Sequence, residues 1–372
     1  MIRSVTIGGF KRFATEEFDF AQLTILTGLN GAGKTTLLQA MLMAAEASTT
    51  QAHSLPLNGP FGLELGTAED VLNWESKSPI RLEFLTSDNG LLEWVFNVPS
   101  EEAFYLNIEK RPAIRAKPFS GKPRSFTYLS AERLGPKGFM ATSALPESEL
   151  EVGVHGEYSA HVLNVLGDRP LENIERKHPN CEGGAPRLLK YEVEQWLSEI
   201  TRPIEVTGER APGSTVAEIK FRTPGSPWVR ATNMGFGVSY ALPIILAGLI
   251  AEKGGVLLVE NPEAHLHPAG QSRMGVFLAW LAGRGVQTIV ETHSDHVING
   301  IRRAVAELRY LAATDSVVQW FGDKRASEEE ALSTKLSIRD TGGLSAWPEG
   351  FFDQYQLDVS ALGRLRREKR ST

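Results

Sequence analysis

The stretch Gly28-Leu29-Asn30-Gly31-Ala32-Gly33-Lys34-Thr35 fits the pattern G-x4-G-K-[ST], which predicts a loop that wraps around phosphate groups. We expect a short strand before it, over residues 23–27, and a helix after it, over residues 33–47. Glycines let backbone N–H groups turn inward, and the helix N-terminus adds positive potential. The alternative is a glycine turn before a surface helix. The residues expected to hold the phosphates are Asn30, Gly31, Ala32, Gly33, Lys34, Thr35 and Thr36.

Two further apolar runs end in polar residues. Residues 255–260 end in Glu260, which is typical of a buried parallel strand whose last residue lies at a ligand-binding edge. There Glu260, together with the Thr35 hydroxyl, is suited to hold Mg²⁺. Residues 287–291 lead into Thr292-His293-Ser294-Asp295, where a neutral His293 is placed to sense an outer phosphate or to position water. The alternatives are a capped core strand for Glu260 and a structural histidine.

Composition excludes several classes of protein. The 372 residues are 42% hydrophobic and 23% charged, and 39 basic against 45 acidic residues leave a net charge of −6. Disorder, a collagen-like chain and a general attraction to nucleic acid or membrane are therefore not expected. The single cysteine, Cys181, and an N-terminus without signal-peptide features predict a cytoplasmic location. The longest apolar run, residues 238–250, is too short to span a bilayer and predicts a buried helix.

Strands that alternate with helices predict a three-layer α/β fold with β-rich additions. We expect the N-terminal part of the main α/β domain over 1–134, an insertion over 135–202, the C-terminal part of the same domain over 203–325, and a small C-terminal domain over 326–372. Residues 135–187 are rich in Gly, Pro and His, so little regular structure is expected there. His155, His161, His178 and Cys181 lack the spacing of a zinc site.

These motifs together resemble an ABC-type ATPase head of the RecF, SMC and overcoming-lysogenization-defect (OLD) branch. The matching elements are residues 28–36 (Walker A), 256–268 (Walker B and the loop after it) and 292–295 (the switch-histidine region). Four more stretches are similar to a bacterial group of AAA-labelled ATPases that ends in a domain of unknown function with a WPEGFFD-like motif. These stretches are residues 128–133, 233–239, 260–268 and 347–353.

The resemblance implies a homodimer, or a higher homo-oligomer, that holds two ATP molecules and Mg²⁺ between its heads. Each site would combine the Walker motifs of one subunit with the signature loop of the other. Residues 233–239 occupy the signature position, although they depart from the usual LSGGQ, and the contacts expected there are Asn233, Gly235, Gly237 and Ser239. A turn that caps a core helix is the alternative. Ser130, Glu132 and Arg133 correspond either to a Q-loop-like contact or to a strand-end ion pair.

One departure concerns catalysis. Such heads usually place a catalytic Glu directly after the metal-site acid, and here Glu260 is followed by Asn261. An amide can orient water but cannot accept its proton, so Glu263 is the alternative base. We therefore expect slow hydrolysis, or a nucleotide-gated clamp that barely turns over.

By family analogy, the first hypothesis is an ATPase that controls a separately encoded, nuclease-like effector in antiphage defence or DNA metabolism. No Asp-x-Asp pair of a Toprim nuclease follows the head. The second hypothesis is a RecF-like DNA-binding repair clamp without an effector, so contact with nucleic acid stays possible. A transporter subunit is disfavoured, and no membrane partner is expected. The WPEGFFD motif is either a hydrophobic plug or a docking surface, and the basic run 364–370 either contacts phosphate or is a solvated tail.

Overall fold

The fold is described from a computed structural model. The structure describes residues 1–76, 79–88, 90–114, 116–180, 187–322, 332–348, 350–352 and 357–362. Expectations for Cys181, for the run 364–370, and for Glu349 and Asp353 of the WPEGFFD motif lie outside these residues.

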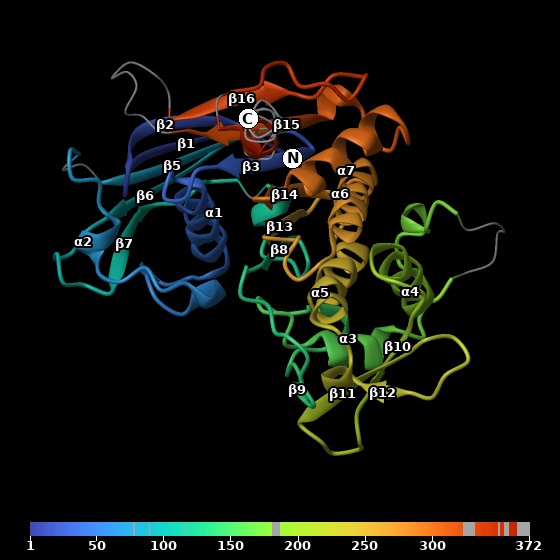
Figure 1. The fold of residues 1–372 in the computed structure, drawn as a ribbon. Helices are drawn as coiled ribbons and strands as arrows, with labels where there is room; N and C mark the ends of the chain where they lie inside the picture. The colour runs from blue at the N-terminus through green and yellow to red at the C-terminus, as the bar shows by residue number, and fades with distance from the viewer. Residues whose placement is uncertain are drawn as a thin grey trace, which may run out of the picture.

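The middle of the molecule is a six-stranded sheet with the order β16-β15-β3-β14-β13-β8 (Figure 1). Five neighbouring strands run parallel, and β16 pairs antiparallel with β15 at one edge. Both faces of this sheet are covered, which explains why its central strands are continuous apolar runs in the sequence. The strands are β3 (Leu23–Gly28), β8 (Phe126–Leu129), β13 (Val256–Glu260), β14 (Gln287–Glu291), β15 (Ser316–Phe321) and β16 (Ser333–Ser337).

One face of the central sheet is covered by helix α1 (Lys34–Thr49) and by a second, antiparallel sheet with the order β2-β1-β5-β6-β7-β4. One core fills this side and includes Leu26, Val256 and Leu258 of the central sheet. The strands of the antiparallel sheet are β1 (Ile2–Phe10), β2 (Phe13–Asp19), β4 (Ser54–Pro56), β5 (Ile80–Thr86), β6 (Leu91–Asn97) and β7 (Tyr105–Lys110), and the short helix α2 (Ala68–Val71) lies beside them.

The other face is covered by helices α5 (Phe236–Ile250), α6 (Pro268–Gly283) and α7 (Asp295–Ala306). Alternate strand residues, such as Leu257 and Val259, point into the core on this side. The three-layer α/β fold is therefore confirmed. A small lobe adjoins the helical layer at the bottom of Figure 1 and contains α3 (Ser159–Leu166), β9 (Met140–Ala141), β10 (Glu205–Glu209), β11 (Val216–Arg222) and β12 (Val229–Arg230). Helix α4 (Leu189–Ile200) packs against α5 and α6 and leads into this lobe.

The structure adds elements that the sequence did not predict. Helix α3 (Ser159–Leu166) lies within the segment 135–187, where little regular structure was expected, and it is buried on the side that faces the core. Strand β7 was not expected. Residues 333–337, assigned to a small C-terminal domain that begins at 326, form β16 of the central sheet instead.

The WPEGFFD motif packs on the head through one ring. Phe351 is fully buried, and its ring centroid lies 5.2 Å from that of Trp320 in β15 and 4.8 Å from that of Trp347. Trp347 itself is 51% exposed. The described part of the motif therefore forms a hydrophobic plug against the central sheet.

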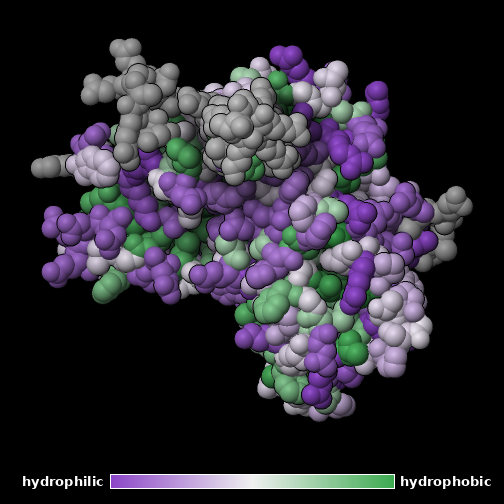
Figure 2. All heavy atoms as spheres, viewed as in Figure 1, coloured by the Kyte–Doolittle hydropathy of each residue, from purple (hydrophilic) through white to green (hydrophobic). Residues whose placement is uncertain are grey.

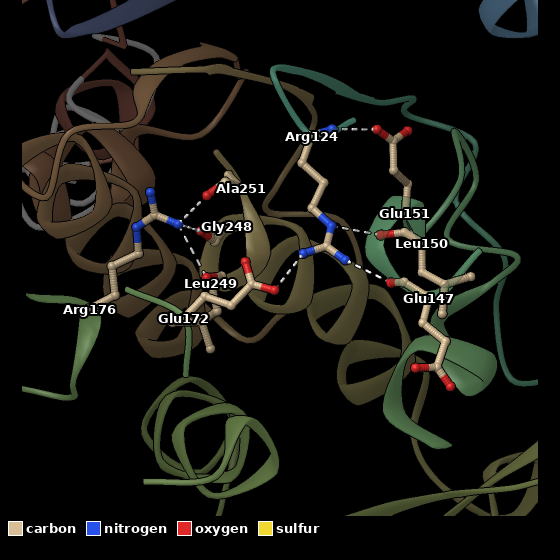
Figure 3. Close-up of polar contacts among 9 residues, drawn as sticks. All are labelled: Arg124, Glu147, Leu150, Glu151, Glu172, Arg176, Gly248, Leu249 and Ala251. Carbon is tan, nitrogen blue, oxygen red and sulfur yellow. Dashed lines mark hydrogen bonds and ion pairs between the residues drawn. The ribbon is translucent and has the colours of Figure 1, made fainter. Parts of the chain in front are cut away.

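Helix α5 is held at its C-terminal end by an arginine (Figure 3). The Nη1 atom of Arg176, which is fully buried, donates to the carbonyl oxygens of Gly248, Leu249 and Ala251 at 3.3, 3.2 and 2.5 Å. These carbonyls have no partner within the helix, and a cation is favourable at a helix C-terminus. Nearby, Arg124 joins the start of β8 to the lobe through the carbonyl of Leu150 at 2.9 Å.

On the face seen in Figure 2, hydrophobic residues lie in small groups separated by hydrophilic ones. No helix among the described residues combines the length and the apolar character that crossing a membrane requires.

Candidate functional site

The parallel strands bring the predicted site residues to one edge of the central sheet. Gly28 ends β3, Glu260 ends β13 and Glu291 ends β14. Glu260 pairs in register with Glu291, and Glu291 pairs with Leu26 of β3. The loop 28–36, the acid Glu260 and the segment that carries His293 therefore meet at the carboxyl ends of adjacent strands, where α/β sheets bind ligands.

The loop that joins β3 to α1 depends on glycine at defined positions. Gly28, Gly31 and Gly33 have φ angles of 133°, 72° and 114°, which favour glycine. A Cβ atom at Gly28 would lie 2.1 Å from the carbonyl oxygen of Phe321. The same oxygen accepts a hydrogen bond from the N–H of Leu29 at 2.9 Å. Strand β15 therefore holds the loop from one side.

The charges at the loop are positive. Lys34 is 3% exposed, and its Nζ atom donates to the carbonyl oxygens of Gly28 and Leu29 at 3.0 and 2.8 Å. Burial lowers the pKa of Lys34, and the charge of Glu291 opposes that change. Helix α1 begins after Gly33 with no side-chain cap and no acid in its first turn, which leaves its N-terminus suited to an anion. Arg12, which sequence reasoning missed, adds a cation at the rim because its Nη1 atom donates to the carbonyl of Gly31 at 2.5 Å.

Two acids lie beside this loop, and they face different partners. The Oε1 and Oε2 atoms of Glu260 accept hydrogen bonds from Tyr128 Oη at 2.8 Å and from the N–H of Ala131 at 3.4 Å. Glu291 is 6% exposed, and its Oε1 atom accepts from the Thr35 hydroxyl at 3.5 Å. Burial, reinforced by the charge of Glu260, raises the pKa of Glu291 to about 7. Sequence reasoning missed Glu291, although it ends an apolar strand in the same way as Glu260.

The oxygen donors fit a magnesium ion. Thr35, Glu260 and Glu291 offer one hydroxyl and two carboxylates, and Mg²⁺ in proteins uses one or two carboxylates together with phosphate oxygens and water. The Oε2 atom of Glu291 is buried without a hydrogen-bond partner, as expected of a group that awaits a cation. Within the described ranges, no group of three or more His, Cys, Asp or Glu side chains is suited to hold a metal without such additional ligands.

The residues considered for catalysis lie next to these acids. Asn261 has a φ of 43°, and its N–H donates to the carbonyl of Glu291 at 2.8 Å. The carboxylate of Glu263 accepts from the Thr292 hydroxyl and from the N–H of His293, both at 2.8 Å. Partial desolvation and the charge of Lys34 lower the pKa of His293, although Glu263 opposes them, so neutral imidazole is favoured at pH 7.

Arg133 joins this edge to helix α5. Its guanidinium is buried and donates to the carbonyl oxygens of Ser130 and Glu260 at 2.8 and 2.6 Å, and to that of Asn261 at 2.6 Å. Its Cζ atom lies 5.6 Å from the ring centroid of Tyr240 in α5. Burial lowers the pKa of Arg133 to about 10, so it stays charged at neutral pH. Its described partners are main-chain carbonyls and a ring rather than the carboxylate of an ion pair, and the Q-loop-like contact stays a prediction.

The signature-like loop, residues 233–239, packs on the loop that follows β13. A Cβ atom at Gly237 would lie 2.7 Å from the carbonyl oxygen of His265, and the ring of Phe236 lies 5.2 Å from that of His265. Asn233 and Gly235 are exposed, whereas the Ser239 hydroxyl is buried and has no hydrogen-bond partner. Among the described residues, no hydrogen bond or ring contact joins this loop to residues 28–36 of the same chain.

Three solved structures match this chain at low identity, and one of them has a TM-score above 0.5. The "SMC head domain from Thermotoga maritima" is 13% identical, with a TM-score of 0.43, over 91% of this chain and 99% of that chain. An SmcHead bound to the C-winged helix domain of ScpA is 13% identical, with a TM-score of 0.44, over 92% of this chain and 95% of that chain. A Pyrococcus furiosus Smc head domain, bound to the C-terminal domain of ScpA, is 12% identical, with a TM-score of 0.53, over 98% of this chain and 99% of that chain. No curated protein matches the sequence.

Two family models match the chain. Residues 315–362 match a protein of unknown function, DUF3696, so this match starts inside the range that the sequence assigned to the head. Residues 23–299 match the family described as "AAA domain, putative AbiEii toxin, Type IV TA system". The match includes Lys34, Thr35, Glu260, Glu291 and His293 but neither Arg12 nor Phe321. Because it covers well over half of the chain, the chain belongs to this family of AAA-domain ATPases.

Proposed function

We propose that the chain is an ATP-binding head that acts in the cytoplasm, closes into a homodimer on nucleotide, hydrolyses ATP slowly and controls a separately encoded effector. The observation that carries the proposal is the meeting of Lys34, Thr35 and Glu260 at one sheet edge, with His293 beside them. The ammonium of Lys34 would exchange its loop carbonyls for phosphate oxygens, and the N-terminus of α1 would add backbone donors. Thr35 and a carboxylate of this edge would hold Mg²⁺, which supplies charge stabilisation at the phosphates.

Slow hydrolysis follows from the residues around the attacking position. Asn261 stands where a carboxylate usually accepts the proton of water, and an amide has no such capacity. Glu263 is the remaining base, and both of its oxygens already accept hydrogen bonds from residues 292 and 293. These bonds fix the position of the carboxylate and leave one lone pair on each oxygen, so proton transfer to Glu263 depends on water reaching one of those lone pairs.

The exposed half of the signature-like loop supports closure between two heads. Asn233 and Gly235 lie at the N-terminus of α5, where backbone N–H groups favour phosphate. Among the described residues, no hydrogen bond joins them to the loop 28–36 of their own chain. A second copy would supply these groups to the nucleotide, with Gly237 and Ser239 shaping the turn. The buried hydroxyl of Ser239 favours that supporting role over direct contact.

A protein effector is favoured over direct action on DNA. The net charge of −6 gives no general attraction to a polyanion. The Pyrococcus furiosus Smc head, which shares the fold, is described with the C-terminal domain of ScpA bound to it. By analogy, this head would bind a protein partner. A nuclease-like effector in antiphage defence or DNA metabolism is the specific form that we propose.

The first test is nucleotide binding by the full chain. Lys34→Met should abolish binding of a fluorescent ATP analogue, because it removes the buried cation of the loop. Lys253→Met removes an exposed lysine that pairs with Glu175 and should bind like the wild type. Equal binding by both variants would refute the nucleotide site.

Further measurements separate the finer parts of the proposal. Asn261→Glu should raise the rate of phosphate release, and Glu263→Gln should lower it. If Glu263→Gln and Asn261→Ala both leave a measurable rate unchanged, neither residue acts on the water. Light scattering should show an ATP-dependent dimer that Gly235→Trp prevents. Co-purification with the product of a neighbouring gene supports an effector, whereas ATP-dependent binding of duplex DNA that weakens with salt supports the RecF-like clamp instead.

A further inference from the structure

The two acids at the sheet edge differ in what their carboxylates contact. Glu260 and Glu291 end neighbouring strands in register. Both oxygens of Glu260 accept hydrogen bonds from residues at the end of β8, namely Tyr128 and Ala131. Glu291 instead accepts from the hydroxyl of Thr35, the residue of the loop that is suited to a metal. Among the described residues, Glu291 is therefore the acid to which that hydroxyl donates a hydrogen bond.

The second oxygen of Glu291 has no partner. Glu291 is 6% exposed, and its Oε2 atom is buried without a hydrogen bond from any described residue. The ammonium of Lys34 does not fill this place, because its hydrogen bonds go to the carbonyls of Gly28 and Leu29. A buried carboxylate oxygen without a donor is unfavourable, and a divalent cation would satisfy it.

We propose that Glu291 is the acid that holds Mg²⁺ together with Thr35, directly or through a water molecule, and that Glu260 is a positioning residue. The inference rests on the proposed nucleotide function. The carboxylate of Glu260 accepts a hydrogen bond from Tyr128, and its main-chain carbonyl accepts one from Arg133. Together these two bonds hold the end of β13 in place. The division of roles departs from the expectation that Glu260 holds the metal.

The electrostatics of the site make this division testable. A carboxylate beside the loop repels a metal-free triphosphate and attracts a metal-bound one. Glu291→Gln removes that charge while keeping the size of the side chain. ATP binding without metal should therefore stay equal or become tighter, whereas the gain in affinity on adding Mg²⁺ should be lost. A residue with a purely structural role would weaken both.

The experiment measures the dissociation constant of a fluorescent ATP analogue for the full chain, in excess Mg²⁺ and in EDTA. We expect the ratio of the two constants to fall by at least about tenfold in Glu291→Gln and by much less in Glu260→Gln. Glu46→Gln, which changes a half-buried carboxylate in α1, is the matched control and should keep the wild-type ratio. An unchanged ratio in Glu291→Gln, or a loss confined to Glu260→Gln, would overturn the inference.

A second variant covers the case in which Glu291→Gln does not fold. Glu291→Asp keeps the charge but shortens the side chain, so the Mg²⁺ gain should shrink while binding in EDTA stays unchanged. A wild-type gain in Glu291→Asp would count against the proposal. The outcomes also separate the two proposals: if the wild type binds no nucleotide in either buffer, the nucleotide function fails, whereas a wild-type Mg²⁺ gain that persists in both variants refutes only the role of Glu291.

Discussion

Replacing Arg133 by methionine should destabilise the whole head, and the structure allows the size of the effect to be worked out. The guanidinium donates three hydrogen bonds to main-chain carbonyls, and each charge-assisted bond contributes about 1.5–3 kcal/mol. Against this stands the cost of burying the cation. The pKa falls from 12.5 to about 10, which corresponds to roughly 3 kcal/mol. Methionine removes that cost but leaves three acceptors without a donor.

The hydrogen bonds therefore outweigh the burial cost, and we expect Arg133→Met to lose about 3 kcal/mol of unfolding free energy. Arg133→Lys keeps the charge but cannot reach all three carbonyls, so a loss of about 1–2 kcal/mol is expected. Urea unfolding of the full chain, followed by far-UV circular dichroism, measures both losses. Because the lost bonds include those to Glu260 and Asn261, affinity for ATP in Mg²⁺ should fall as well.

The matched control for Arg133 is Arg202→Met. Arg202 is exposed, and the contact that the structure records for its side chain is the Met234 sulfur at 4.0 Å, so its replacement should change stability by less than about 0.5 kcal/mol. If Arg133→Met costs no more than Arg202→Met, the three hydrogen bonds do not hold the sheet edge and the reasoning fails.

Three other perturbations have defined outcomes. Arg176→Met should cost about 2–4 kcal/mol in urea unfolding, because three carbonyls at the end of α5 lose their donor; a loss below about 1 kcal/mol would contradict this. Phe351→Ala should cost about 3–5 kcal/mol, whereas Trp347→Ala, at a half-exposed ring, should cost clearly less; equal losses by thermal melting would argue against a plug. In the nucleotide-free protein the folded state raises the pKa of Glu291 from 4.5 to about 7, so this carboxylate destabilises the fold progressively as pH rises from about 4.5 to 7, by roughly 3 kcal/mol in total. Urea midpoints at pH 5 and 8 in EDTA should therefore differ more in the wild type than in Glu291→Gln, and parallel profiles would refute the assignment.

The sequence predicted those parts of the fold in which local pattern and burial agree. The strand, loop and helix around residues 23–49 were predicted because the G-x4-G-K-[ST] spacing is typical of a phosphate-binding loop between a strand and a helix. The strands that end in Glu260 and Glu291 were found because both of their faces are buried, which makes them apolar throughout. Helix α5 was expected for the same reason.

The missed elements carry weak local signals. Helix α3 has only 8 residues and lies in a stretch rich in Gly and Pro, so its helical periodicity is too short to stand out. Strand β7 buries only Leu106 and Ile108, and its charged end is typical of a loop. The pairing of β16 with β15 depends on tertiary contacts that no local pattern encodes.

The sequence predicted those residues of the candidate site that act through their side chains. Lys34, Thr35 and Glu260 have recognisable motifs, and the structure places them at one edge. The partners of Arg133 could not be predicted, because they are carbonyl groups that every residue has. Glu291 was not predicted because the polar residues that follow it, above all His293, carry the more familiar signal, although the rule that singles out Glu260 applies equally to Glu291.

The hydrogen bond from the N–H of Leu29 to the carbonyl of Phe321 has a consequence for biosynthesis. The loop 28–36 is synthesised before β15, and most of the described elements lie between the two in the sequence. Because a ribosome releases the chain from its N-terminus, the loop must wait for these elements to emerge before β15 can lie beside β3. A nascent chain that stops before β15 would therefore lack the support of this strand, and under the proposed function its nucleotide site would be incomplete.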